Sequence, residues 1–278
     1  MRTTLDNLRD RLLGVWSLAA ILFLFMPIFV IVLFSFNDNQ GRFNFTWQGF
    51  TLRHWADPFG VEGVQEAFLT SIGLAALTTI VAVILGVCVA LALVRHRWRG
   101  RGAVGGLVFL PLATPEVVLG AALLGWFLTM GLVRGFVTLL IAHVMFTLGY
   151  VVITIRARME GMDEHIEEAA MDLGANQLTT LRKVTLPLLA PGVAAAALLS
   201  FAISIDDFVV SNFTAGQTVT FPLYVYGAAR QGVPPQVNVL ATAMLIVVVG
   251  LMFVNLLLQK RSARRQSREL AQTPALGH

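Results

Sequence analysis

Three acidic residues interrupt segments of the chain that are otherwise apolar, and each of them could bind a cation. Glu116 follows a break that contains two prolines, and Asp206 and Asp207 are adjacent in the chain. A charge within a membrane span is costly and usually marks a functional position. The same apolar segments contain no Lys or Arg, so carboxylates that face a central path would favour a cationic solute. The alternative role for all three is hydrogen bonding to neighbouring helices.

Two further observations refine this cation-binding hypothesis. Successive residues of a helix point about 100° apart, so we expect Asp206 and Asp207 to differ in role. One would face the path, and the other would cap a helix or bind an opposing subunit. Trp47 lies in an aromatic stretch and could contact a cation at an outer mouth, where such a contact is worth about 0.5–2 kcal/mol. Anchoring at the membrane interface is the alternative for this tryptophan.

The sequence contains no arrangement typical of an enzyme. The five histidines have no metal-ligand spacing, and the single cysteine, Cys88, can form neither a disulfide framework nor a cysteine metal site. Neither of the two lysines, Lys183 and Lys260, lies in a Gly-rich loop or precedes Ser or Thr. A phosphate-binding GxxxxGK[ST] loop is therefore absent. We predict no catalytic residue, no metal site and no cofactor bound by this chain.

The elements that would position the acids are membrane helices. The 278 residues are 56% hydrophobic and 13% charged, whereas a typical soluble domain is about 25% charged. A membrane helix needs about 20 apolar residues. We therefore predict an all-α, polytopic membrane protein with six transmembrane helices, at residues 12–36, 67–94, 103–130, 135–155, 188–210 and 237–258.

The basic residues predict the orientation of these helices. Most of the 20 Lys and Arg residues fall near the two termini, in the loop 95–101 and in the loop 156–187. Because basic residues collect on the cytoplasmic side, we expect both termini to be cytoplasmic, with the chain in a bacterial cytoplasmic (inner) membrane. Residues 1–11 would form a cytoplasmic N-terminus, 12–258 a membrane domain and 259–278 a basic cytoplasmic tail. This distribution accounts for the high pI without nucleic acid.

The loop 156–187, named the coupling loop below, is long and polar for a connection between two membrane helices. Asp163 could cap a helix that ends near Leu173, Gly174 could end that helix in the left-handed conformation, and Asn176 could cap a second helix. This pattern predicts a helix, a glycine turn and a second helix. The physics of the residues alone leaves two interpretations open, a solvated loop and a docking element.

The coupling loop also resembles a known family, the permease subunits of binding-protein-dependent ABC importers. Their EAA motif is matched by Glu168-Ala169-Ala170, three residues, Gly174, nine residues and Val184-x-Leu186-Pro187, with Val184 where the family has Ile. The resemblance implies the type I permease fold and a coupling helix seated in a groove of a separate ATP-binding subunit. It implies that Glu168 makes the polar contact, that Ala169 and Ala170 pack closely, and that Gly174 forms the turn.

The resemblance further implies partners and a cargo. A dimer of ATP-binding subunits would hold ATP and Mg, a second homologous permease would complete the path, and an extracytoplasmic substrate-binding protein would deliver the solute. The stretches 33–38, 47–52 and 204–208 resemble the second permease of spermidine/putrescine importers. The resemblance then implies a polyamine path with five residues: Trp47, Glu116, Ser204, Asp206 and Asp207. Other cargoes (iron, an opine or an amino-acid-like amine) and an ion-driven secondary transporter are the alternatives.

Overall fold

The computed structural model describes residues 4–39, 41, 43–163 and 165–272, and these residues are helical apart from turns and one isolated bridge. The chain divides into two compact units. One comprises residues 1–65 and 225–246, and the other comprises residues 66–224 and 247–278. Because each unit has its own internal packing, each is described by itself.

The first unit begins with α1 (Thr4–Phe34), whose apolar window is not buried by any other described part of the chain. The connection after it is held by the buried side chain of Asn37. Its Nδ2 donates to Oδ1 of Asn44 at 2.7 Å and to the carbonyl of Thr46 at 2.8 Å. The rings of Phe36 and Phe50 stack near the bridge that pairs Asn37 with Phe50. These contacts give the connection 35–63, which includes α2 (Arg53–Ala56), a defined conformation.

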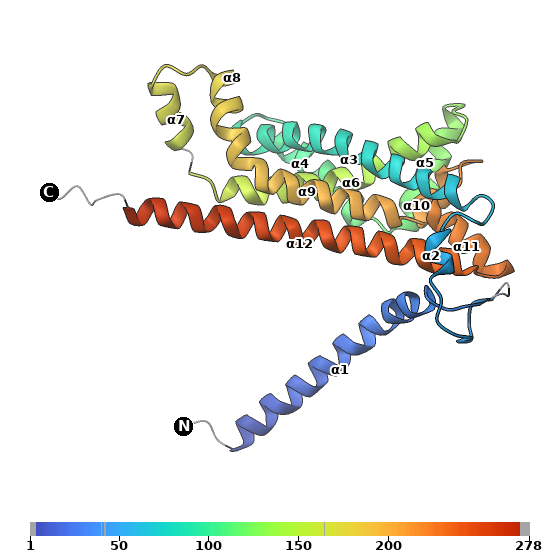
Figure 1. Cartoon of the computed structure of the whole chain (residues 1–278). Helices are drawn as coiled ribbons and strands as arrows, with labels where there is room; N and C mark the ends of the chain where they lie inside the picture. Colours follow the sequence, from blue (N-terminus) through green and yellow to red (C-terminus); the bar gives the residue numbers. More distant parts are fainter. Residues whose placement is uncertain (1–3, 40, 42, 164, 273–278) are drawn as a thin grey trace. The chain divides into compact units, whose positions relative to one another are not determined.

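The second unit is built on α3 (Val64–Arg95), α6 (Phe136–Glu160) and α9 (Leu186–Asp206). These helices lie near one another in the ribbon (Figure 1). They share an apolar core that includes Ala82, Ile155 and Leu189. Small residues permit the helices to approach closely, as is common in membranes. A methyl group on Gly149 of α6, for example, would lie 2.7 Å from the carbonyl oxygen of Val108 in a neighbouring helix.

The segment expected as one span at 103–130 is a bent pair of helices. Between α4 (Arg101–Ala113) and α5 (Glu116–Thr129) the chain is bent by 111°. The residue before a proline is driven out of the helical conformation, and Thr114, which precedes Pro115, is extended with φ −90° and ψ 130°. Pro115 also lacks the amide hydrogen that would continue the helix. The break therefore falls at Thr114 and Pro115, whereas Pro111 lies inside α4.

The remaining elements complete the expected helical pattern. The coupling loop contains α7 (His165–Asp172), α8 (Gln177–Thr180) and the π-helical turn η1 (Leu181–Thr185), which leads directly into α9. The segment expected at 188–210 is interrupted after Asp206, and the chain continues as α10 (Val209–Thr214), α11 (Phe221–Gln231) and α12 (Pro235–Gln272). Among the described residues, five helices are long and apolar enough to cross a membrane, or six spans if the bent pair counts as one.

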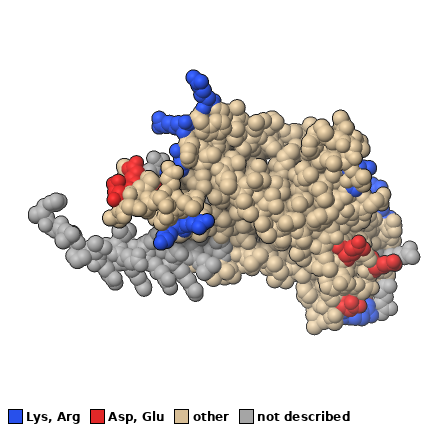
Figure 2. All heavy atoms as spheres, turned by 90° about the horizontal axis from the view of Figure 1, so that it is seen from above, with Lys and Arg blue, Asp and Glu red and all other residues tan. Residues whose placement is uncertain are grey.

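The distribution of charge agrees with this membrane architecture. On the face shown in Figure 2, the charged side chains gather toward the two ends of the helices, and an uncharged band lies between them. Five predicted spans correspond to helices or to the bent pair: 12–36 to α1, 67–94 to α3, 103–130 to α4 and α5, 135–155 to α6, and 237–258 to part of α12.

Candidate functional site

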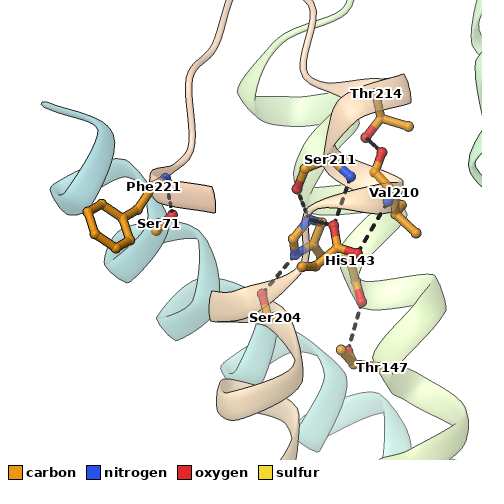
Figure 3. A network of polar contacts seen from close by, with 9 residues as sticks. Ser71, His143, Thr147, Ser204, Val210, Ser211, Thr214 and Phe221 are labelled. Atoms are coloured by element: carbon orange, nitrogen blue, oxygen red, sulfur yellow. Dashed lines mark hydrogen bonds and ion pairs between the residues drawn. The ribbon is translucent and has the colours of Figure 1, made fainter. Parts of the chain in front are cut away.

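A buried polar network surrounds His143 in the second unit (Figure 3). Its Nδ1 lies 2.8 Å from Oγ of Ser204 in α9, and its Nε2 lies 2.9 Å from Oγ of Ser211 in α10. The same Nε2 lies 3.4 Å from Oδ2 of Asp207. His143 is fully buried in α6, and the two serines are also buried. This histidine therefore links three helices through hydrogen bonds.

Asp207 caps the helix that follows it. Its two carboxylate oxygens accept hydrogen bonds from the backbone amides of Val210 at 3.2 Å and Ser211 at 2.8 Å. Helix N-termini leave such amides without internal partners, and a carboxylate there is also stabilised by the helix dipole. Asp207 is therefore buried, and its carboxylate is engaged within the chain.

Asp206 has the opposite environment. It is the last residue of α9 and is exposed, and it lies within electrostatic reach of Asp207 and of Glu116. Glu116 is the first residue of α5 and is also exposed. The packing of α5 against α10 brings these acids together, since Leu119, Leu123 and Val210 share one apolar cluster. The structure thus places the three predicted acids near one another. Asp206 and Glu116 are exposed, and Asp207 is buried.

The other predicted path residues differ in placement. Ser204 is buried, and its hydroxyl is bonded to His143. Trp47 belongs to the first unit, where its side chain is 47% exposed and its ring meets the ring of Phe34 edge to face at 6.4 Å. The structure therefore places four of the five predicted path residues in one unit and Trp47 in the other.

The coupling loop has the predicted order of elements. The carboxylate of Asp163 accepts a hydrogen bond from the amide of His165 at 3.0 Å, at the start of α7. Gly174 follows α7 with φ +91°, a left-handed conformation that favours glycine. Asn176 then caps α8, because its side chain accepts a hydrogen bond from the amide of Thr179 at 2.8 Å. The second helix does not stop before Pro187: α8 continues through η1 into α9, and Pro187 lies in the first turn of α9.

The outer face of α7 is available for contact. No residue of α7 is buried, and Leu173, which follows it, is 90% exposed. Glu168 is also exposed, at 65% of its side chain, and it lies 3.0 Å from Nδ1 of His165. Ala169 is exposed and Ala170 is half-buried. The loop therefore presents an acid, small residues and an apolar side chain on the surface.

Glu167, the neighbour of Glu168, is turned toward the chain itself. Its Oε1 accepts hydrogen bonds from Nη2 of Arg95 at 3.2 Å and from Oγ1 of Thr185 at 2.9 Å. Its side chain is 17% exposed, and that of Arg95 is 14% exposed. Sequence reasoning did not identify Glu167, Arg95, Thr185 or Ser211. For Glu167 the sequence did contain an indication. Glu167 and Glu168 are adjacent, and adjacent residues of a helix cannot point in the same direction.

These features define a class: a polytopic, all-helical membrane protein with acids at helix breaks and an exposed helical loop at one end of the bundle. Comparison with known proteins then gives the family. Residues 82–268 match the model of the binding-protein-dependent transport system inner membrane component. The chain belongs to this family, and it is a permease subunit of an ABC transporter that depends on a binding protein. A permease subunit is not itself catalytic.

Several curated relatives share most of the chain. The spermidine/putrescine transport system permease protein PotC of Haemophilus influenzae is 39% identical over 241 residues, which are 86% of this chain and 93% of that protein. PotC of Escherichia coli is 37% identical over 248 residues, which cover 89% and 93%. The putrescine transport system permease protein PotI of Escherichia coli is 34% identical and covers 89% of this chain and 90% of that protein.

Solved structures support the same fold. A chain from a bacterial ABC transporter that imports the acidic polysaccharide alginate aligns with a TM-score of 0.64 and 18% identity, covering 93% of this chain and 97% of that chain. A chain of the MetNI methionine ABC transporter in an inward-facing conformation aligns with a TM-score of 0.56 and 15% identity, covering 73% and 94%. At these identities the likeness extends to the fold alone.

Proposed function

We propose that this permease forms half of the translocation path for a small cationic solute, a polyamine such as spermidine or putrescine. The observation that carries the proposal is the exposed acid pair of Asp206 and Glu116, set at helix breaks in spans that contain no Lys or Arg. A carboxylate at membrane depth is costly unless it is paired, and a diamine or triamine would supply the partner. The names of the relatives at 34–39% identity support the same cargo.

The helix ends suggest which acid has the greatest need of a cation. Glu116 and Asp207 stand at the N-termini of α5 and α10, where the helix dipole favours a carboxylate. Asp206 stands at the C-terminus of α9, where the dipole opposes a negative charge. We therefore assign Asp206 as the principal contact for an ammonium group of the solute, with Glu116 as the second carboxylate.

The remaining path residues take supporting roles in this proposal. Asp207 and Ser204 fix the geometry of the break through His143 rather than contacting the solute. Trp47, which is half exposed in the connection 35–63, would contact the solute at the outer mouth. A ring at such a position attracts a cation by about 0.5–2 kcal/mol.

The coupling loop would dock onto a dimer of ATP-binding subunits, which hold ATP and Mg. Glu168 would contact a basic residue there, Ala169 and Ala170 would allow close approach, and Leu173 would bury its exposed side chain. Gly174 would preserve the turn. Leu186 and Pro187, the first two residues of α9, would join the coupling loop to that helix. A second permease and an extracytoplasmic binding protein would complete the importer complex. In this arrangement the loop, residues 1–11 and residues 259–278 are cytoplasmic, in agreement with the excess of basic residues there.

Uptake by the whole importer in proteoliposomes tests the cargo. We expect labelled spermidine to accumulate with ATP and to be displaced by putrescine. Asp206→Asn should raise the half-saturating concentration about 10- to 100-fold, because a hydrogen bond to a charged group is worth about 1.5–3 kcal/mol. Glu66→Gln, which neutralises an exposed acid in the first turn of α3, is the control. Uptake that polyamines do not compete for would refute the polyamine assignment.

Co-purification tests the docking. Glu168→Arg should release the ATP-binding subunits from the membrane complex while this chain stays in the membrane. Glu66→Arg makes the same charge reversal outside the coupling loop and should leave the complex intact. If the Glu168→Arg complex keeps its ATPase and its ATP-driven uptake, this glutamate has no docking role.

A further inference from the structure

The two adjacent glutamates of α7 point to different partners. Glu168 is exposed, whereas the side chain of Glu167 is largely buried against Arg95 and Thr185. Arg95 is the last residue of α3, and Thr185 is the last residue of η1, which leads into α9. One carboxylate oxygen, Oε1, therefore accepts hydrogen bonds from both transmembrane elements.

The attachment of α7 to the bundle depends on few contacts of other kinds. No residue of α7 is buried, so this helix has no apolar core of its own to hold it in place. A cavity of about 420 Å³ lies beside the pair, lined by residues that include Leu91, Arg95, Glu167 and Leu181. The polar contacts of Glu167 therefore attach α7 to the rest of the chain at a place where apolar packing is incomplete.

We propose that Glu167 is a positioning residue that transmits movement of the coupling helix to two membrane helices at once. Through Arg95 it fixes α7 to α3, and through Thr185 it fixes α7 to α9. A displacement of α7 by the ATP-binding subunits would then move the ends of both helices together. This inference rests on the proposed docking of α7, but it concerns the inward-facing glutamate, which takes no part in that docking.

Transport coupling in the reconstituted importer tests the proposal. Glu167→Gln keeps the size of the side chain and removes its charge. We expect the ATP-binding subunits to remain in the complex, while the number of spermidine molecules transported per ATP hydrolysed falls about tenfold, within the usual range of coupling between sites. Thr185→Val, which removes only the hydroxyl, should produce a smaller loss of the same kind. Glu160→Gln, which breaks the exposed ion pair with Arg156, is the matched control and should leave the ratio unchanged.

A charge exchange separates this role from a loss of folding. Arg95→Glu should uncouple transport from hydrolysis, and combination with Glu167→Arg should restore at least part of the ratio. Loss of the ATPase from the Glu167→Gln complex would overturn the proposal, because Glu167 would then be a docking residue. An unchanged ratio in Glu167→Gln, or no rescue by the exchange, would overturn it as well. The docking proposal fails by a different outcome: the Glu168→Arg complex would keep its ATP-binding subunits and its ATP-driven uptake.

Discussion

The Nε2 atom of His143 lies 3.4 Å from Oδ2 of Asp207, where α6, α9 and α10 meet. This contact, together with two backbone amides, occupies the carboxylate of Asp207 within the chain. Asp206, one residue earlier, is exposed. The adjacent aspartates thus differ in role. Asp207 stabilises the helix break, and Asp206 remains available for a solute.

This division predicts different effects of substitution on stability. Asp207→Ala should lower the free energy of unfolding by about 1–2 kcal/mol through loss of the helix cap. Asp206→Asn should leave stability unchanged while it weakens uptake. Thermal unfolding of the two variants purified in the same detergent measures the difference. Equal destabilisation by both substitutions would contradict the assignment.

Loss of the His143 side chain should destabilise the protein more when the hydroxyls of Ser204 and Ser211 remain than when they are removed as well. His143→Leu leaves the buried hydroxyls of Ser204 and Ser211 without that partner, at about 1–3 kcal/mol for each unsatisfied group. Replacing both serines by alanine in the same chain removes those unsatisfied groups. We therefore expect the triple variant to unfold at a higher temperature than His143→Leu. A lower unfolding temperature for the triple variant would show that the hydroxyls stabilise the protein independently of the histidine.

Two glycines in neighbouring helices should respond oppositely to a methyl group. The added carbon of Gly149→Ala would lie 2.7 Å from the carbonyl of Val108, so α4 and α6 must separate, at a cost of about 1–3 kcal/mol. The same change at Gly105 of α4 meets no atom within 4 Å and should cost nothing. Detergent thermal unfolding of the two variants provides the comparison. Similar unfolding temperatures would contradict the close packing of these helices.

The bend between α4 and α5 should depend on proline. Spin labels at positions 105 and 125, both open in the structure, can be placed in a Cys88→Ala background. A straight helix would separate these backbone positions by about 30 Å, and the bend shortens this distance. The double substitution Pro111→Ala and Pro115→Ala should shift the measured distances toward the longer value. An unchanged distribution would mean that tertiary packing, not proline, sets the angle.

Much of the local structure could be predicted from the sequence, because its determinants lie within a few residues of one another. Apolar length predicted the membrane helices, and Asp163, Gly174 and Asn176 marked the caps and turn of the coupling loop. The prolines indicated a break near residue 115. Its bend of 111° could not be derived from them, since a proline marks where a helix breaks but not the direction in which the chain continues.

The contacts that organise the two sites could not be predicted, because they join distant segments. Arg95 and Glu167 are 72 positions apart, and His143 and Ser211 are 68 positions apart. In the sequence, His143 is the only histidine of an apolar span, and a single histidine does not indicate its partner. The pairing emerges only when the helices are assembled.

The turn between α4 and α5 has a consequence for hydration. Thr114 is extended, Pro115 has no amide hydrogen, and Pro115 and Glu116 are exposed at the surface of this chain. Hydrocarbon cannot solvate such backbone, so irregular segments at membrane depth occur only beside protein or water. Lipid is therefore excluded from this face of the bend. Either a partner subunit covers it or a column of water reaches it, and in the second case the same water would hydrate an arriving ammonium group until the carboxylates replace it.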